Sequence, residues 1–150
     1  MFRGGSTVNL DAKGRLALPT RYRAPITEQY EGHLVLTVHG DGCLLLYPQP
    51  EWDDIERKLT RLPNQDPRTR GLVRMLIGHA TDVELDAHGR ILIAPRLREF
   101  AKLDKRVSLA GVGNKFEIWD EAIWDQKSKT WLAEEVGTDN MPDPFASLTL

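Results

Sequence analysis

Two short stretches of the sequence place an aspartate four residues before an arginine, with a glycine directly before the arginine. They are Asp11-Ala12-Lys13-Gly14-Arg15 and Asp86-Ala87-His88-Gly89-Arg90. A carboxylate at this spacing can close a turn and orient the guanidinium, and an oriented guanidinium can bind guanine O6 and N7 with two hydrogen bonds. The alternative is a solvated turn, in which the aspartate pairs with the arginine or caps the loop and Lys13 only keeps a strand edge soluble.

The two stretches belong to a longer internal repeat. Residues 8–18 and 83–93 align without a gap at an offset of 75 residues, with identical Val, Leu, Asp, Ala, Gly and Arg. A second similarity, an aromatic residue with Trp five positions later, relates residues 44–52 to residues 116–124 at an offset of 72. Two copies at so long a period are too few for a solenoid of stacked units. The sequence therefore predicts two related modules that share one core.

Turn residues and apolar spacing predict a β-rich α+β protein. Alternating apolar residues predict strands at 8–10, 16–18, 35–38, 44–47, 107–110 and 116–119. Prolines and helical spacing predict helices from about residues 20 and 96, at 51–62 and 67–78, and from 120 to about 136. We divide the chain into module 1 (residues 5–53), a helical connector (54–80), module 2 (81–126) and a C-terminal segment (127–150) that ends the last helix and continues as a loose tail.

Composition restricts the class of protein. At 150 residues, with 41% hydrophobic content and a formal net charge of −2, the chain can form one globular domain or two very small ones with a common core. Cys43 is the single cysteine, which excludes an internal disulfide, and no spacing of Cys and His is typical of a metal site. No signal peptide or membrane-spanning stretch is apparent. We expect a cytoplasmic protein without membrane, metal, cofactor or small-molecule substrate.

The repeated motif and its flanking residues resemble the MraZ family. The similarity extends to Met1-Phe2-Arg3-Gly4, Leu44-Leu45-Leu46-Tyr47-Pro48 with Glu51-Trp52, Gly78-His79-Ala80 and Asn114-Lys115-Phe116-Glu117-Ile118-Trp119. It implies two AbrB-like swapped-hairpin modules that form a compact double-psi-type β-barrel with peripheral helices, and ring-like homo-oligomers. It also implies a nucleoid-associated transcription regulator, with repression expected. The implied target is double-stranded DNA with tandem guanine-rich boxes, upstream of the division and cell-wall gene cluster that includes its own gene.

Basic side chains gather near the N-terminus. The first 23 residues carry five basic residues against Asp11, a local charge of +4 in a chain of −2. If the first loop projects from the barrel that the resemblance implies, it can enter a DNA major groove. We then expect Arg15 to read a base and Lys13 to contact a base or a phosphate, with Asp11 and Gly14 supporting the turn. The basic residues expected to hold the phosphate backbone are Arg3, Arg21 and Arg23.

The second copy of the motif has a less favourable charge for binding a polyanion. His88 replaces the lysine, and from residue 76 onward 9 basic residues stand against 13 acidic ones, a charge of −4. We therefore expect Asp86, Gly89 and Arg90 to form a supporting turn, with an ion pair between Asp86 and Arg90, and module 2 to serve the scaffold. His88 is expected to be an exposed turn residue and not a metal ligand.

Three other functions remain open at this point. The chain could be another AbrB-like protein, such as an antitoxin that represses its own operon, although such chains usually carry one module and a disordered tail. It could be a structural ring that does not bind DNA. It could also be a small hydrolase using Asp11 or Asp86 with His79 or His88, but nothing in the spacing demands catalysis, and we expect no enzyme. The four tryptophans lie at strand or helical spacing and are expected to pack in the core or an interface.

Overall fold

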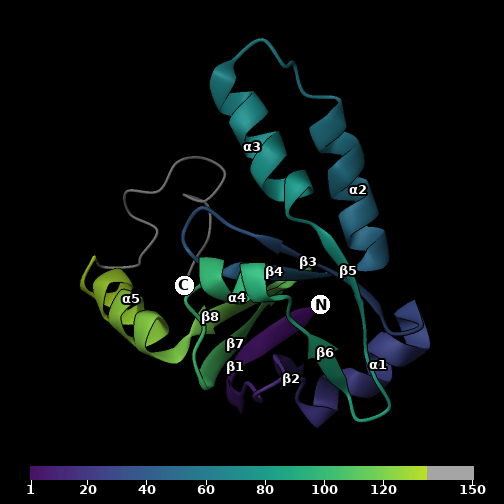
Figure 1. Cartoon of the computed structure of the whole chain (residues 1–150), viewed down its shortest axis with the longest axis vertical. Coiled ribbons are helices and arrows are strands. Elements are labelled where there is room, and N and C mark those ends of the chain that lie inside the picture. Colours follow the sequence, from purple (N-terminus) through teal and green to yellow (C-terminus); the bar gives the residue numbers. More distant parts are fainter. Residues whose placement is uncertain (135–150) are drawn as a thin grey trace, which may run out of the picture.

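The computed structural model describes residues 1–134 of the 150-residue chain. Its main element is a six-stranded sheet in which all neighbouring strands are antiparallel (Figure 1). In order across the sheet, the strands are β1 (Phe2–Asn9), β7 (Arg106–Gly113), β8 (Phe116–Asp120), β4 (Leu44–Pro48), β3 (His33–Val38) and β5 (Thr81–Glu84). Strands from the two halves of the chain are thus interleaved within one sheet.

The sheet confirms the predicted β-rich α+β class. The strands predicted at 35–38, 44–47, 107–110 and 116–119 are all present. The sheet is not closed, however, because β1 and β5 are its two edges in the described part of the chain. The double-psi-type barrel that the resemblance implied is therefore not confirmed.

A separate two-stranded ribbon joins the two modules. β2 (Arg15–Ala17) pairs antiparallel with β6 (Arg90–Leu92), so each strand comes from a different copy of the repeat. Leu16 and Ile91 lie opposite each other at the centre of the ribbon, and both are fully buried. Because side chains alternate along a strand, the other four residues share the outward face. They are Arg15, Ala17, Arg90 and Leu92.

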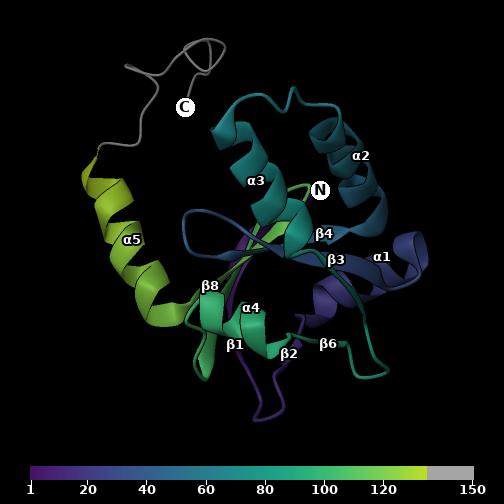
Figure 2. The same ribbon diagram turned by 45° about the horizontal axis from the view of Figure 1, so that its top comes forward.

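Helices follow the ribbon strands and cover the sheet. α1 (Thr20–Tyr30) and α4 (Pro95–Phe100) begin shortly after β2 and β6, as predicted. α2 (Gln49–Thr60) and α3 (Pro67–Gly78) form a helical hairpin at one end of the molecule, and α5 (Glu121–Ala133) packs against β7 and β8 (Figures 1 and 2). The predicted helix end near residue 136 and the loose tail lie outside the described residues. None of the described helices has the length and apolar character needed to cross a membrane.

Two apolar clusters hold these elements together. One contains the buried side chains of the ribbon, α1 and one face of the sheet. The other lies beneath α2, α3 and α5 and contains Cys43, where burial raises the pKa of the thiol to about 12 and keeps it protonated. The tryptophans that belong to this second cluster or contact one another beside it are Trp52, Trp119, Trp124 and Trp131. The predicted packing role is confirmed for Trp52 and Trp119, which are buried, and for Trp124, which packs against the cluster. Trp131 is 36% exposed and contacts the other rings from the surface.

Replacing Ile91 by Ala should lower the free energy of unfolding by about 2–5 kcal/mol, because this fully buried side chain fills the centre of the ribbon. Leu92→Ala on the same strand is the matched control: Leu92 is 58% exposed, and its loss should cost less than about 1 kcal/mol. Urea denaturation followed by tryptophan fluorescence measures both values. Equal losses for the two variants would contradict the burial pattern of the ribbon.

Candidate nucleic-acid interface

The first motif forms a tight loop, residues 11–15, which we call loop 1. The Asp11 carboxylate accepts hydrogen bonds at Oδ1 from the backbone nitrogens of Lys13 (2.9 Å) and Arg15 (2.8 Å). Its Oδ2 accepts a further bond from Arg15 Nε at 2.7 Å. Gly14 has φ +83°, a conformation that favours glycine, and its backbone nitrogen donates to the Asp11 carbonyl oxygen. One carboxylate therefore closes the turn and fixes the guanidinium.

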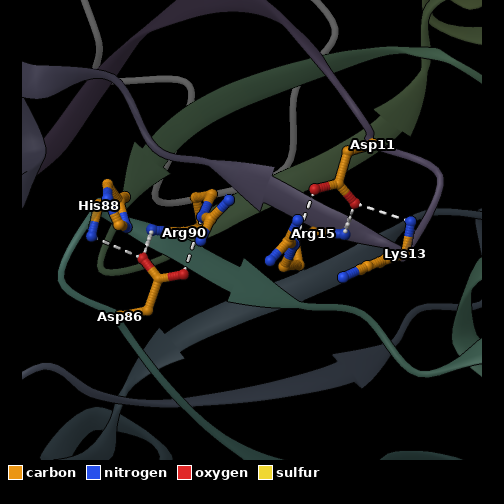
Figure 3. Close-up of polar contacts among 6 residues, drawn as sticks. All are labelled: Asp11, Lys13, Arg15, Asp86, His88 and Arg90. Carbon is orange, nitrogen blue, oxygen red and sulfur yellow. Dashed lines mark hydrogen bonds and ion pairs between the residues drawn. The ribbon is translucent and has the colours of Figure 1, made fainter.

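The second motif, residues 86–90, forms loop 2 with the same bonding pattern (Figure 3). Asp86 Oδ1 accepts from the backbone nitrogens of His88 (2.8 Å) and Arg90 (2.9 Å), and Oδ2 accepts from Arg90 Nε (2.8 Å). Gly89 has φ +73°. The ion pair expected between Asp86 and Arg90 is thus present, and His88 is exposed. No group of three or more Cys, His, Asp or Glu side chains within residues 1–134 could hold a metal ion.

Hydrogen bonding keeps both loop carboxylates ionised. The backbone nitrogen of Arg90 is the main cause that lowers the pKa of Asp86 to about 2, and the equivalent bond from Arg15 lowers the pKa of Asp11. Hydrogen bonds to a carboxylate favour its charged form, so both aspartates are anionic at neutral pH. The guanidinium groups are therefore held by charge-assisted hydrogen bonds in both loops.

The Arg15 guanidinium keeps two nitrogens for another partner. Its Nε is used by Asp11, whereas neither Nη has a hydrogen-bond partner within residues 1–134. The Arg15 side chain is 32% exposed, and Lys13 beside it is exposed. Both loops lie at the end of the molecule opposite the α2–α3 hairpin (Figures 1 and 2). Loop 1 therefore presents two donor nitrogens, held by Asp11, beside a free ammonium group.

Each loop is also supported by the other module. The Gly14 carbonyl oxygen accepts from Ile93 N at 2.8 Å, and the Gly89 carbonyl oxygen accepts from Leu18 N at 2.9 Å. Arg98 of α4 packs over Gly14, so a Cβ there would lie 2.8 Å from the guanidinium carbon. A Cβ on Gly89 would collide in the same way with the side chain of Arg23, from α1. The two loops are thus built as a reciprocal pair.

The other predicted contact residues do not gather around loop 1. Arg23 is half-buried over loop 2, where its Nε donates to the Leu18 carbonyl oxygen at 2.7 Å. Arg21 is exposed, donates to Ser6 Oγ at 3.0 Å and stacks over the Tyr22 ring. Arg3 is exposed near the start of β1, the end of that strand remote from loop 1. The structure therefore brings together only Lys13 and Arg15 of the five.

The residues that do lie beside loop 1 were not predicted from the sequence. An open groove of about 1030 Å³ separates residues 9–12 from residues 98–106 at the end of α4 and the start of β7. Lys102 and Lys105 line it and are exposed. The net charge of module 2 is negative, which gave no indication that two of its lysines lie beside loop 1. A net charge summed over a segment does not show which residues the fold brings together.

These features define a class of protein: a β-rich chain of two related modules, each of which presents an arginine on a loop that the other module supports. The predicted internal repeat is visible in the three-dimensional structure as the reciprocal pair of loops around the ribbon (Figure 3).

Comparison with known proteins identifies the family. The family model of the MraZ protein, whose description likens it to antitoxins, matches residues 1–75 and again residues 76–140. The transcriptional regulator MraZ of Thioalkalivibrio sulfidiphilus is 55% identical over 148 residues, which cover 99% of this chain and 97% of that protein. Those of Halorhodospira halophila and Pseudomonas aeruginosa are 49% and 50% identical, with 100% of both chains covered in each case. The chain belongs to the MraZ family, which is a family of transcriptional regulators and not of enzymes.

Replacing Asp86 by Asn should destabilise the protein near pH 6 and have progressively less effect as the pH falls toward about 2. The folded pKa of Asp86 is about 2, below its ordinary value of 3.8, mainly because of the bond from Arg90 N. The stabilisation is therefore fully present above about pH 4 and is lost as the pH falls through the folded pKa. The difference in Tm between wild type and variant across this range tests the sign.

The control for this measurement is Asp125→Asn, which removes an exposed carboxylate from α5. Its Tm should follow that of the wild type at every pH. A Tm difference for Asp86→Asn that stays constant from about pH 6 to 2 would show that the carboxylate charge does not stabilise loop 2.

Proposed function

We propose that this chain is a sequence-specific DNA-binding transcriptional regulator that reads guanine with the Arg15 side chain of loop 1. One observation carries the proposal: Asp11 holds the guanidinium through Nε, which leaves the two Nη groups for acceptors outside the protein. A two-stranded ribbon fits the major groove of B-form DNA, and guanine O6 and N7 accept two hydrogen bonds from arginine there. The names of the relatives as transcriptional regulators support DNA as the partner.

Roles for the other basic residues follow from their exposure. Lys13 would contact a base or a phosphate beside Arg15, since it is exposed in the same loop. Arg3 and Arg21 would hold phosphates further along the duplex. Arg23 would reach a phosphate only with its terminal nitrogens, because its Nε is bonded to the Leu18 carbonyl oxygen.

We further propose that the chain works as a ring-like homo-oligomer on repeated sites. A single loop neutralises few phosphates and would bind weakly at cellular salt. Identical loops at fixed spacing around a ring would contact tandem guanine-rich boxes together and raise the effective concentration of each later contact. The exchange of strands in the β2–β6 ribbon supports the AbrB-like swapped-hairpin arrangement on which this picture depends.

The target and location that we propose follow the resemblance. The boxes would lie upstream of the division and cell-wall gene cluster that includes the chain's own gene. Binding at the boxes would repress transcription of that cluster. The protein would be cytoplasmic and associated with the nucleoid. Footprinting on the DNA upstream of the gene tests the site, and reporter expression with and without the protein tests repression. A protected region elsewhere, or increased reporter expression, would contradict these parts of the proposal.

Arg15→Ala should raise the Kd for the specific duplex by roughly 5- to 150-fold for each engaged loop, which corresponds to the ~1–3 kcal/mol of discrimination of one bidentate contact. Gel-shift titration measures the Kd, and size-exclusion chromatography and Tm should stay near those of the wild type. Arg90→Ala is the matched control, because it removes an arginine with the same aspartate pairing from loop 2. Specific affinity that survives Arg15→Ala, or falls equally in both variants, would refute the assignment to loop 1.

DNA binding should also weaken steeply with salt, although the chain has a sequence pI of about 6.1. If Lys13, Arg3 and Arg21 each neutralise one phosphate, these three contacts should contribute about −3 for each bound subunit to the slope of log K against log salt concentration. Fluorescence anisotropy at several salt concentrations between roughly 50 and 200 mM measures the slope. A slope near zero would show that the clustered cations do not contact phosphates.

A further inference from the structure

The two loops have the same internal geometry but different surroundings. Leu10, next to loop 1, donates its backbone N–H to the Lys105 carbonyl oxygen at 2.8 Å, and Leu85, next to loop 2, donates to the Gly32 carbonyl oxygen at 3.0 Å. Each loop therefore lies against the segment that enters a sheet strand of the other module. The side chains on these two segments differ in charge.

Loop 1 lies beside basic side chains of module 2. Lys102 and Lys105 line the groove next to residues 9–12, are exposed and form no ion pair within residues 1–134. Arg106 lines it too, but its Nε is paired with Glu121 at 2.7 Å. Asp11 is already neutralised by Arg15. The remaining acidic residues in the groove lining are Glu99 and Asp104. The remaining basic residues are Arg98, Lys102 and Lys105, and Lys13 of loop 1 lies next to the groove.

Loop 2 lies beside two acidic side chains, Glu31 of module 1 and Glu84 of β5 in module 2. His33 Nδ1 is 3.1 Å from Glu84 Oε1, and His33 Nε2 is 3.9 Å from Glu31 Oε2. The two carboxylates are 71% and 87% exposed, so they face solvent at the edge of loop 2. A phosphate next to Arg90 would meet this negative charge, whereas a phosphate next to Arg15 would meet two free ammonium groups.

We propose that Lys102 and Lys105 form a phosphate-binding track for the DNA strand that passes loop 1. Module 1 would thus supply the base contact and module 2 the adjacent backbone contacts, joined by the reciprocal packing of the two loops. The proposal rests on the proposed function, because it requires DNA at loop 1. It assigns to module 2 a direct part in binding in addition to its role as scaffold.

The test is a double variant, Lys102→Asn with Lys105→Gln, in the full-length chain. Asn is chosen at the first position because Lys102 has φ +54°, which Asn tolerates. The control is Arg57→Gln with Lys58→Gln, which removes the same charge from α2 at the other end of the molecule, where both residues pair with Asp54. Lys102→Arg with Lys105→Arg keeps the charge and should bind DNA like the wild type.

Anisotropy titrations would use two duplexes: the DNA upstream of the chain's own gene, and a duplex of the same composition in scrambled order. The Asn/Gln variant should lose roughly tenfold in affinity for both duplexes at ~0.15 M salt, and its log K against log salt slope should be smaller in magnitude by about 2 for each bound subunit. The ratio of the two Kd values should stay unchanged, because phosphate contacts carry no sequence information.

The possible outcomes separate this proposal from the proposed function. If the Asn/Gln variant binds like the Arg57/Lys58 control, with the same salt slope, the phosphate track is refuted while loop 1 can still read DNA. A changed Kd ratio with an unchanged slope would also refute it, since that result indicates base contact. If Arg15→Ala leaves specific binding intact, the proposed function fails first. Circular dichroism and size-exclusion chromatography establish that all variants are folded.

Discussion

The reciprocal hydrogen bonds at Gly14 and Gly89 are the constraint on which the rest of the structure depends. Each glycine takes a positive φ to close its own loop, and its carbonyl oxygen then accepts from the backbone of the other module. An arginine of the other module occupies the space above each glycine, so a side chain there would force that arginine to move. The two loops, the ribbon between them and the helices that follow therefore have to form together.

This constraint explains how a flexible arginine is held in a defined position. Loop 1 is short and exposed, so fixing it in one conformation without contacts from other segments would lose much conformational entropy. Bonds from the Asp11 carboxylate restrict the turn from inside, and Ile93 together with Arg98 restricts it from outside. A side chain positioned before its ligand arrives loses less entropy on binding. The cost of ordering the arginine is thus met during folding.

Much of this organisation could be predicted from local sequence. The repeat, the turns around both glycines, the helices after the ribbon strands and four strands of the sheet were predicted, because each depends on residues close together in the chain. Only the end of β1 was predicted, and β5 was missed. Which strand pairs with which was not predicted, since the β1–β7 and β2–β6 pairings join residues far apart in sequence. The position of Arg23 was missed for the same reason. A signal existed: the gap-free alignment of the repeat, extended past residue 18, pairs Arg23 with Arg98, and both hold the opposite loop.

The two loops also show why identical geometry does not by itself determine a function. Asp11 with Arg15 and Asp86 with Arg90 have the same bonds within about 0.1 Å, so the inner structure of the loops gives no reason to favour either one. What differs is the charge beside each loop. Loop 1 lies near Lys102 and Lys105 of the opposite module, whereas loop 2 lies near Glu31 of the opposite module and Glu84 of its own module. A polyanion responds to charge over a distance of roughly 10 Å, well beyond the loop itself. An internal repeat can therefore keep both copies of a turn for folding and still restrict ligand binding to one, by changing only the residues around it.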